Sequence, residues 1–292
     1  MIDFTFNGEA KQFPENWQEV APGLLPGILR ALFVEPESPE TYTKLLRLNL
    51  GYSDKKWRKL CQRYFRPELT EKQRERNAEL LAFLVGRLAW MWKTPVDVRP
   101  VESVRVGGTP RLLPDPELKT VTYGELTDAY VHLVAFVEQL EPGEKRLNLL
   151  LSTVCRPEQK GSYQARADWN GDARIPYNEH VAQATADEWA GVPLAERLPV
   201  FLYVVGAMKN LLSTYDIFAA ESIDTVGSQE EYPGQGLIKN QHSLAEKGIF
   251  GNMKETRQAG AHEVLLFLEE QKKDDARVAR EPEKKPDHYG IP

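Results

Sequence analysis

Two stretches in which apolar residues recur at helical spacing constrain the fold of this chain most strongly. In residues 122–154 two apolar stripes flank the short turn Glu141-Pro142-Gly143, and so short a connection favours antiparallel neighbouring helices. Thr122 and Glu125 have the spacing of a capping box at the first helix start. Residues 198–212 are apolar on nearly all sides, which is typical of a helix inside a bundle. We therefore predict a mainly α fold, a helical bundle.

The first residues predict a small β-hairpin in front of the helices. Apolar and polar residues alternate over residues 2–6, Asn7-Gly8 is a preferred pair for a two-residue turn, and residues 9–13 form the return strand. A lone hairpin is only marginally stable in water, so its apolar face must pack on other residues. Such a hairpin either caps the helical body or offers an interaction surface to a partner. The surface residues would be Phe4, Phe6 and Trp17.

Changes in composition divide the chain into four parts. Residues 1–92 hold the hairpin and several predicted helices. Residues 93–119 are rich in proline and contain Gly107-Gly108 between β-branched residues, which predicts a connector or a short β-excursion. Residues 120–271 form the central and C-terminal helical bundle. Residues 272–292 carry charges of both signs, several prolines and no apolar pattern, which predicts a flexible charged tail.

Charge and cysteine content narrow the classes of partner. The formal net charge of −6 argues against a nucleic-acid partner, so the basic face of the helix predicted from Ser53 onward is interpreted as a solvated surface. Cys61 and Cys155 lie far apart without metal-binding spacing, which suits a reducing compartment. The N-terminus lacks the pattern of a signal peptide, and no apolar run is long enough to span a bilayer. We expect an intracellular protein with no membrane partner.

The residue patterns of common catalytic centres are missing from the sequence. The five histidines are scattered, and His262-Glu263 lacks the second histidine of a zinc-protease helix. There is no nucleophile elbow and no glycine-rich phosphate loop. We therefore expect no enzymatic activity, no catalytic residues and no bound cofactor.

One segment, residues 168–179, carries oxygen ligands at the spacing of a calcium loop. Asp168, Asn170 and Asp172 stand at positions 1, 3 and 5, and Glu179 stands at position 12. Short side chains of this kind can surround a hard cation, and the distant glutamate can close the loop with both oxygens. The pattern makes these four residues the candidate ligands of a Ca²⁺ ion.

Other features of the same segment favour a purely structural loop. Ala173 stands where the sharp turn needs glycine, and Pro176 stiffens the part that should wrap the ion. In the structural alternative, Asp172 and Arg174 pair with each other or with neighbouring groups. Asn178 would then cap a helix that begins near residue 179.

Several short motifs follow one another in a particular order. They are Leu113-Pro114-Asp115-Pro116-x-Leu118, Thr122-x-Gly124-Glu125, Cys155-Arg156-Pro157 and the stretch Gly-Asp-x-Arg-x-Pro-Tyr-Asn of residues 171–178. In this order they resemble a family of uncharacterised proteins of tailed phages and prophages of Bacteroidetes. The resemblance extends to the N-terminal hairpin and covers most of the chain, whereas the charged C-terminal tail departs from it.

The resemblance implies a non-catalytic protein of tail morphogenesis, either a structural component or an assembly factor. Its partners would be other phage or prophage tail proteins or a second copy of itself. It would be located in the cytoplasm of the bacterial host, free or incorporated in a virion or virion-like particle. Two alternatives remain: a calcium-binding protein or metal-dependent enzyme that uses residues 168–179, and a bacterial adaptor protein unrelated to phage.

Overall fold

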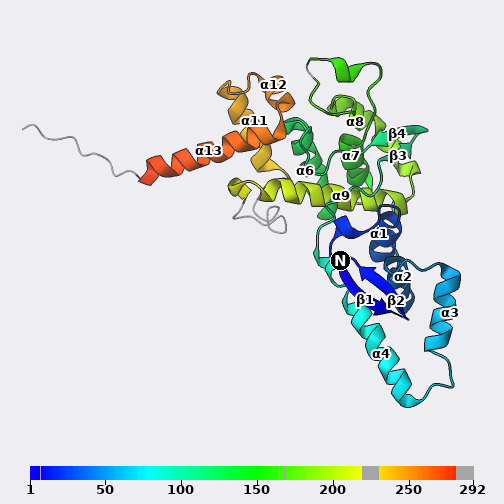
Figure 1. The fold of residues 1–292 in the computed structure, drawn as a ribbon. Helices are drawn as coiled ribbons and strands as arrows, with labels where there is room; N and C mark the ends of the chain where they lie inside the picture. The colour runs from blue at the N-terminus through cyan, green and yellow to red at the C-terminus, as the bar shows by residue number, and fades with distance from the viewer. Residues whose placement is uncertain (7, 168, 219–229, 281–292) are drawn as a thin grey trace, which may run out of the picture.

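The computed structural model describes residues 1–6, 8–167, 169–218 and 230–280. The chain is mainly α-helical, with a two-stranded hairpin at the N-terminus and a small three-stranded sheet, which confirms the predicted fold class. Figure 1 shows an N-terminal unit at one end and a larger helical unit at the other. None of the helices in the described ranges combines the length and the apolar character needed to cross a membrane.

The N-terminal unit begins with the predicted hairpin. Strands β1 (Ile2–Phe6) and β2 (Glu9–Phe13) pair antiparallel with Phe6 opposite Glu9, so the turn has two residues. Gly8 has φ +78°, the left-handed conformation that glycine adopts easily, and Asn7 lies outside the described residues. Five helices follow: α1 (Leu25–Phe33), α2 (Pro39–Asn49), α3 (Asp54–Tyr64), α4 (Glu71–Gly86) and α5 (Trp90–Lys93).

Local capping explains where three of these helices begin. Ser38, Ser53 and Thr70 each accept a hydrogen bond from a backbone N–H in the first turn of the helix that follows. At α4 the side chain of Gln73 also returns to the backbone N–H of Thr70, which completes a capping box. The helix starts of this unit are therefore encoded within a few residues of sequence.

The apolar face of the hairpin packs on the helices of the same unit. Phe6 is 5% exposed and stacks on Tyr64 of α3 with 6.0 Å between ring centroids. Trp17 is fully buried and meets Trp90 edge-on at 4.8 Å. The predicted interaction surface of Phe4, Phe6 and Trp17 is therefore wrong for Phe6 and Trp17, because both side chains belong to the core. Phe4 is half-buried.

The proline-rich residues 93–119 contain the predicted β-excursion. Strands β3 (Ser103–Val106) and β4 (Thr109–Leu112) pair antiparallel around Gly107-Gly108, and both glycines have positive φ. A third strand, β5 (Arg156–Pro157), adds to β4 from a distant part of the chain. The sequence does not predict β5, because two residues show no periodicity.

The larger unit is built on the two stretches with helical periodicity. Helices α6 (Tyr123–Val137) and α7 (Lys145–Val154) pack against each other as the predicted helical hairpin. Helix α9 (Leu194–Ser213) carries the apolar run and also contacts α1, so it joins the two units (Figure 1). The remaining helices are α8 (Glu179–Thr185), α11 (Gln235–Glu246), α12 (Met253–Gln258) and α13 (Ala261–Arg280), and short 3₁₀ helices span Trp17–Glu19, Tyr163–Ala165, Ala186–Gly191 and Asp216–Phe218.

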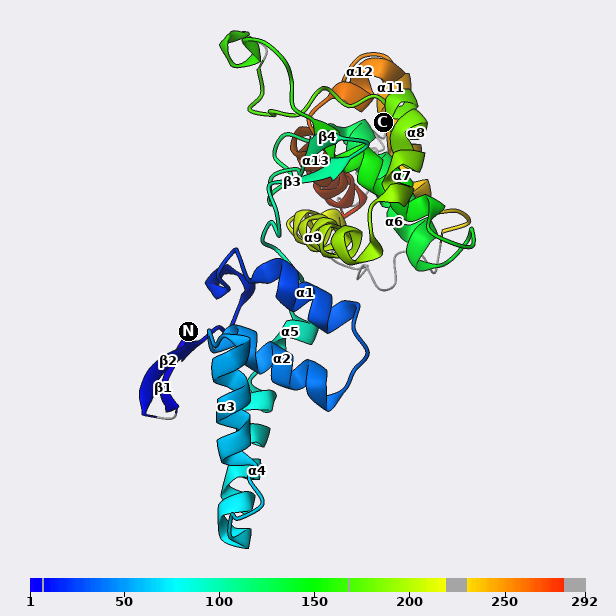
Figure 2. The same cartoon turned by 90° about the vertical axis from the view of Figure 1, so that its right-hand side faces the viewer.

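The C-terminal helix is longer than predicted. Helix α13 continues to Arg280 and extends away from the body of the molecule in Figure 1, whereas Figure 2 views it nearly end-on. The prediction of a flexible tail from residue 272 is therefore wrong for residues 272–280. Lys273 pairs with Glu269 and Glu270 at helical spacing. These ion pairs support the helix where its apolar stripe has ended. Residues 281–292 lie outside the described residues.

Candidate functional site

A cavity of about 700 Å³ opens in the larger unit, between the start of α6, the loop that follows α7, and helices α8 and α12. Residues from three of the four motifs noted in the sequence line it. Its charged lining includes Glu125, Arg156, Asp172, Arg174, Glu179 and Arg257. Because motifs far apart in sequence meet here, this cavity is the candidate functional site.

The motif Thr122-x-Gly124-Glu125 forms one wall. Thr122 accepts a hydrogen bond from the backbone N–H of Glu125 at 3.2 Å and so caps α6. Gly124 is required by close packing: a Cβ atom at this position would lie 2.9 Å from the carbonyl oxygen of Arg257 in α12. Tyr123 between them is fully buried. Every residue of this motif thus has a structural role at the junction of α6 and α12.

The carboxylate of Glu125 does not return to the helix start, so the predicted capping box at α6 is wrong in its second half. The side chain is 1% exposed, and its Oε1 lies 2.8 Å from Nη1 of Arg156 and accepts a hydrogen bond from Nη1 of Arg174 at 3.1 Å. Its Oε2 has no hydrogen-bond partner among the described residues. The carboxylate turns inward because two guanidinium groups offer it charged partners.

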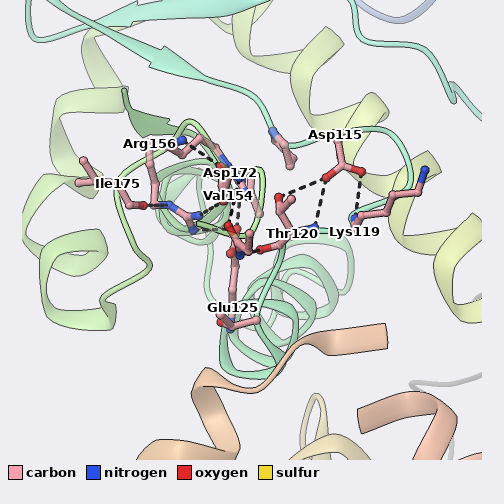
Figure 3. A network of polar contacts seen from close by, with 12 residues as sticks. Asp115, Lys119, Thr120, Glu125, Val154, Arg156, Asp172 and Ile175 are labelled. Atoms are coloured by element: carbon pink, nitrogen blue, oxygen red, sulfur yellow. Dashed lines mark hydrogen bonds and ion pairs between the residues drawn. The ribbon is translucent and has the colours of Figure 1, made fainter. Parts of the chain in front are cut away.

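A second carboxylate, that of Asp172, completes the arrangement. Its Oδ1 accepts from the backbone N–H and from Nε of Arg174, both at 2.9 Å, and its Oδ2 accepts from Nη2 of Arg174 at 2.8 Å and of Arg156 at 3.1 Å. Glu125, Arg156, Asp172 and Arg174 form a four-charge cluster of zero net charge, part of the polar network in Figure 3.

The cluster perturbs the protonation of its members. Burial acts to raise the pKa of Asp172, but the hydrogen bond and charge of Arg174 and the charge of Arg156 outweigh it and hold that pKa below its ordinary value. Burial likewise acts to lower the pKa of Arg174, and the charges of Glu125 and Asp172 reverse this effect and raise it. Both groups therefore remain charged at neutral pH.

A third arginine connects the cavity to the neighbouring helices. Arg257 of α12 donates through Nη2 to Oδ2 of Asp128 in α6 and to Oε2 of Glu179 at the start of α8, both at 2.6 Å. Tyr177 donates its hydroxyl proton to the same Asp128, and burial raises the pKa of this tyrosine. Three helices thus converge on one guanidinium.

The four predicted calcium ligands are not arranged as a ligand set in the described part of the chain. Asp172 faces two guanidinium groups, Glu179 binds Arg257, and Oδ1 of Asn170 accepts from the backbone N–H of Asp172 at 3.0 Å. Asp168 lies outside the described residues, and among those described no three of His, Cys, Asp and Glu are grouped as metal ligands.

The two contacts expected under the structural alternative are present in this segment. Asp172 pairs with Arg174, as described above, and Asn178 accepts from the backbone N–H groups of His180 and Val181, so it caps α8. Gly171 has φ +92°, which glycine alone adopts without strain at this turn.

Sequence reasoning missed the partners that lie far away in the chain. It assigned Glu125 to Thr122, three residues before it, whereas Arg174 is 49 residues away. Charged residues within mostly apolar helical stretches were the signal that could have identified Glu125, because such residues are buried only with a partner.

Compared with models of protein families, with curated proteins and with solved structures, the chain has no match.

The geometry of the cavity suits binding. Its lining holds five Lys and Arg residues against three Asp and Glu residues, so an anionic group is favoured there. At the rim, Lys254 is exposed and the indole of Trp169 is 40% exposed. A ligand segment with a carboxylate beside an apolar group matches this combination of charge and aromatic surface.

Proposed function

We propose that the protein is a non-catalytic component or assembly factor of a phage or prophage tail, and that it acts through protein–protein contacts. The observation that carries the proposal is the convergence of motifs. Segments of the chain that resemble a tail-associated family, from Gly124 to Asn178, supply the four-charge cluster and the cavity walls. Three of the four motifs that carry the resemblance thus shape this cavity.

The state of the charges supports a binding role over acid–base catalysis. Each carboxylate of the four-charge cluster faces two guanidinium groups. A carboxyl group with a lowered pKa, such as Asp172, is a weak base at neutral pH and cannot serve as a proton donor there. The cluster acts as a rigid frame that holds α6, α7 and the loop of residues 156–178 together.

The cavity rim indicates how a partner would be held. Lys254 and the net positive lining would attract a carboxylate of the partner, and Trp169 would pack on an apolar side chain next to it. The partner is another tail protein or a second copy of this chain.

Deletion of the gene from its phage or inducible prophage tests the proposal. We expect heads of normal appearance and missing or defective tails by electron microscopy, with infectivity restored by the wild-type gene in trans. Complementation with Lys254→Glu should fail, because it reverses the charge at the cavity rim. Lys160→Glu, the same change at an exposed position outside the cavity lining, should complement.

The same experiment can exclude the tail role. Normal tails and full infectivity in the deletion strain would rule out a function in tail morphogenesis. If Lys254→Glu complements as well as Lys160→Glu, the tail role would stand, but it would not depend on the cavity rim.

A further inference from the structure

Helices α3 and α4 form an arm that extends from the N-terminal unit, away from the candidate functional site (Figure 1). Their facing sides line a shallow apolar groove of about 30 Å³, which we call the α3–α4 groove. Phe6 of the hairpin also borders it, and the half-buried or exposed side chains that line it include Trp57, Tyr64, Phe65, Leu80 and Leu81. Phe65 is 57% exposed.

The arm is basic although the chain is acidic. Residues 54–87 hold ten Lys and Arg residues against one Asp and four Glu residues, whereas the formal net charge of the whole chain is −6. The sequence alone suggested only a solvated basic face. In the structure this charge surrounds an apolar groove, and a plain solvated surface would not expose that combination.

The charges of α4 are sorted around the groove. At 100° per residue, Arg76 lies beside the groove residue Leu80, one turn away along the helix. Glu71, Glu75 and Glu79 fall on the opposite side. The rim of the groove is therefore basic, and the acidic residues point away from it.

Helix α3 supplies the other basic edge. Arg58 stands three residues before the groove residue Cys61, one helical turn away, and is exposed. On α4, Arg76 is exposed and lies beside Leu80, as described above, whereas Arg87 lies over the ring of Phe83, which is outside the groove lining. Cationic side chains thus flank the apolar floor on both helices.

We propose that the α3–α4 groove binds an acidic amphipathic helix of a partner protein. The apolar face of that helix packs between α3 and α4 and places one aliphatic side chain in the deepest part of the groove. Its Glu and Asp residues meet Arg58 and Arg76 at the rim.

The form of the groove selects a helix over other ligands. Both walls are helices whose backbone groups are already hydrogen-bonded, so an extended strand would find no partner for its own backbone. A third helix packs on two others by side-chain contact alone. Duplex nucleic acid would use the basic rim and leave the apolar floor uncovered. The inference does not depend on the tail role.

A peptide-display selection on the immobilised full-length protein tests the proposal. The library presents helical peptides of about 20 residues, a length that spans the arm. We expect enrichment of sequences with apolar residues at positions i, i+3, i+4 and i+7 and with Glu or Asp on both flanks. Binding of the enriched peptides should weaken as salt is raised from about 50 to 500 mM, because rim charges are screened.

Matched variants locate the binding. Leu81→Glu places a charge in the groove and should reduce affinity at least about tenfold, whereas Ala82→Glu, the next residue and exposed, should retain it. The double variant Arg58→Glu/Arg76→Glu changes exposed residues only, so it remains folded. The double variant should no longer bind the acidic peptides and should instead bind peptides in which Lys replaces Glu.

Three outcomes would overturn the proposal. The first is the absence of an acidic amphipathic pattern among selected peptides. The second is displacement of those peptides by a single-stranded oligonucleotide of equal affinity, which would make the arm a nucleic-acid surface. The third is a dimer in sedimentation that Leu81→Glu dissociates and Ala82→Glu does not, which would show that a second copy covers the groove.

Discussion

The two units of the molecule hold their helices together in contrasting ways. In the larger unit, α6, α7 and the following loop are joined by the four-charge cluster, whose arginines are both almost fully buried. In the arm, α3 and α4 are defined by their caps and by a strip of apolar contacts that remains partly exposed. The larger unit pairs buried carboxylates with buried guanidinium groups, whereas the arm leaves apolar surface in contact with solvent.

The contrast shows what each kind of interaction specifies. A buried ion pair gains little net stability, but it penalises every arrangement in which a charge is left without its partner. Apolar contacts tolerate shifts, and capping acts only on the ends of a helix. The larger unit is therefore expected to be rigid and sensitive to single changes, whereas the arm should adapt and tolerate substitution.

The largest expected effect comes from breaking the four-charge cluster. Arg174→Met leaves Glu125 and Asp172 to share Arg156, and we expect the free energy of unfolding to fall by about 3–5 kcal/mol. Urea denaturation followed by circular dichroism measures the change. Lys160→Met, an exposed position on the same loop, is the control and should change it by less than about 0.5 kcal/mol. A loss below about 1 kcal/mol for Arg174→Met would contradict a rigid cluster.

Two glycines allow the same substitution to be compared in both units. Gly124→Ala brings a Cβ within 2.9 Å of the carbonyl oxygen of Arg257, so α12 must shift and unfolding should become easier by about 2 kcal/mol. Gly86→Ala in α4 meets no atom within 4 Å and should stabilise by about 0.5 kcal/mol through helix propensity. Thermal unfolding of the two variants checks the signs. If both substitutions change the stability in the same direction, close packing would not explain the glycine at position 124.

A half-buried histidine, His132, should make the larger unit sensitive to acid. Burial, followed by the charge of Arg146, lowers the pKa of His132 in α6 to about 4. The unfolded chain takes up the proton near pH 6.5, so this contribution to stability is complete above pH 6.5 and is lost as pH falls to about 4. The loss should reach about 2 kcal/mol after allowance for partial exposure.

Urea denaturation of wild type and His132→Gln at pH 7 and pH 4.5 isolates that contribution. The variant should lose less stability between the two pH values than the wild type, because glutamine does not titrate. Helices α3 and α4 contain no histidine, so amide exchange in the arm should lack this dependence on His132. An identical pH dependence of the two proteins would mean that His132 is protonated as easily in the folded state as in the unfolded one.

The local features of the fold could be predicted from the sequence. The hairpin register follows from the spacing around residues 7–8, and the helix starts after Ser38, Ser53 and Thr70 follow from side chains that act within three residues. The helical hairpin follows from the apolar stripes in residues 122–154. In each case the deciding interaction lies within a few residues or one repeated pattern.

The candidate site could be predicted only in part, because its interactions cross the chain. The carboxylate of Asp172 could bind either a metal ion or a guanidinium group, and its own sequence segment does not distinguish the two. Arg156, 16 residues earlier, is one of the groups that it binds in the structure. Glu125 had an adequate local partner in the sequence, yet tertiary packing placed it against two arginines. The third strand, β5, likewise exists only through its pairing with β4.

The loss of one helix cap distinguishes local from global opening. Thr70→Ala removes the side-chain half of the capping box at α4, in which Thr70 accepts from the backbone N–H of Gln73, and should cost about 1 kcal/mol. If the arm opens independently of the larger unit, hydrogen exchange of the α4 amides should accelerate about fivefold while that of the α6 amides stays unchanged. Thr122→Ala, the matched change at α6, should accelerate exchange in both α6 and α12, because Tyr123 of α6 donates its backbone N–H to Ala259 just after α12. Acceleration of α6 by Thr70→Ala would show that the arm and the larger unit unfold together.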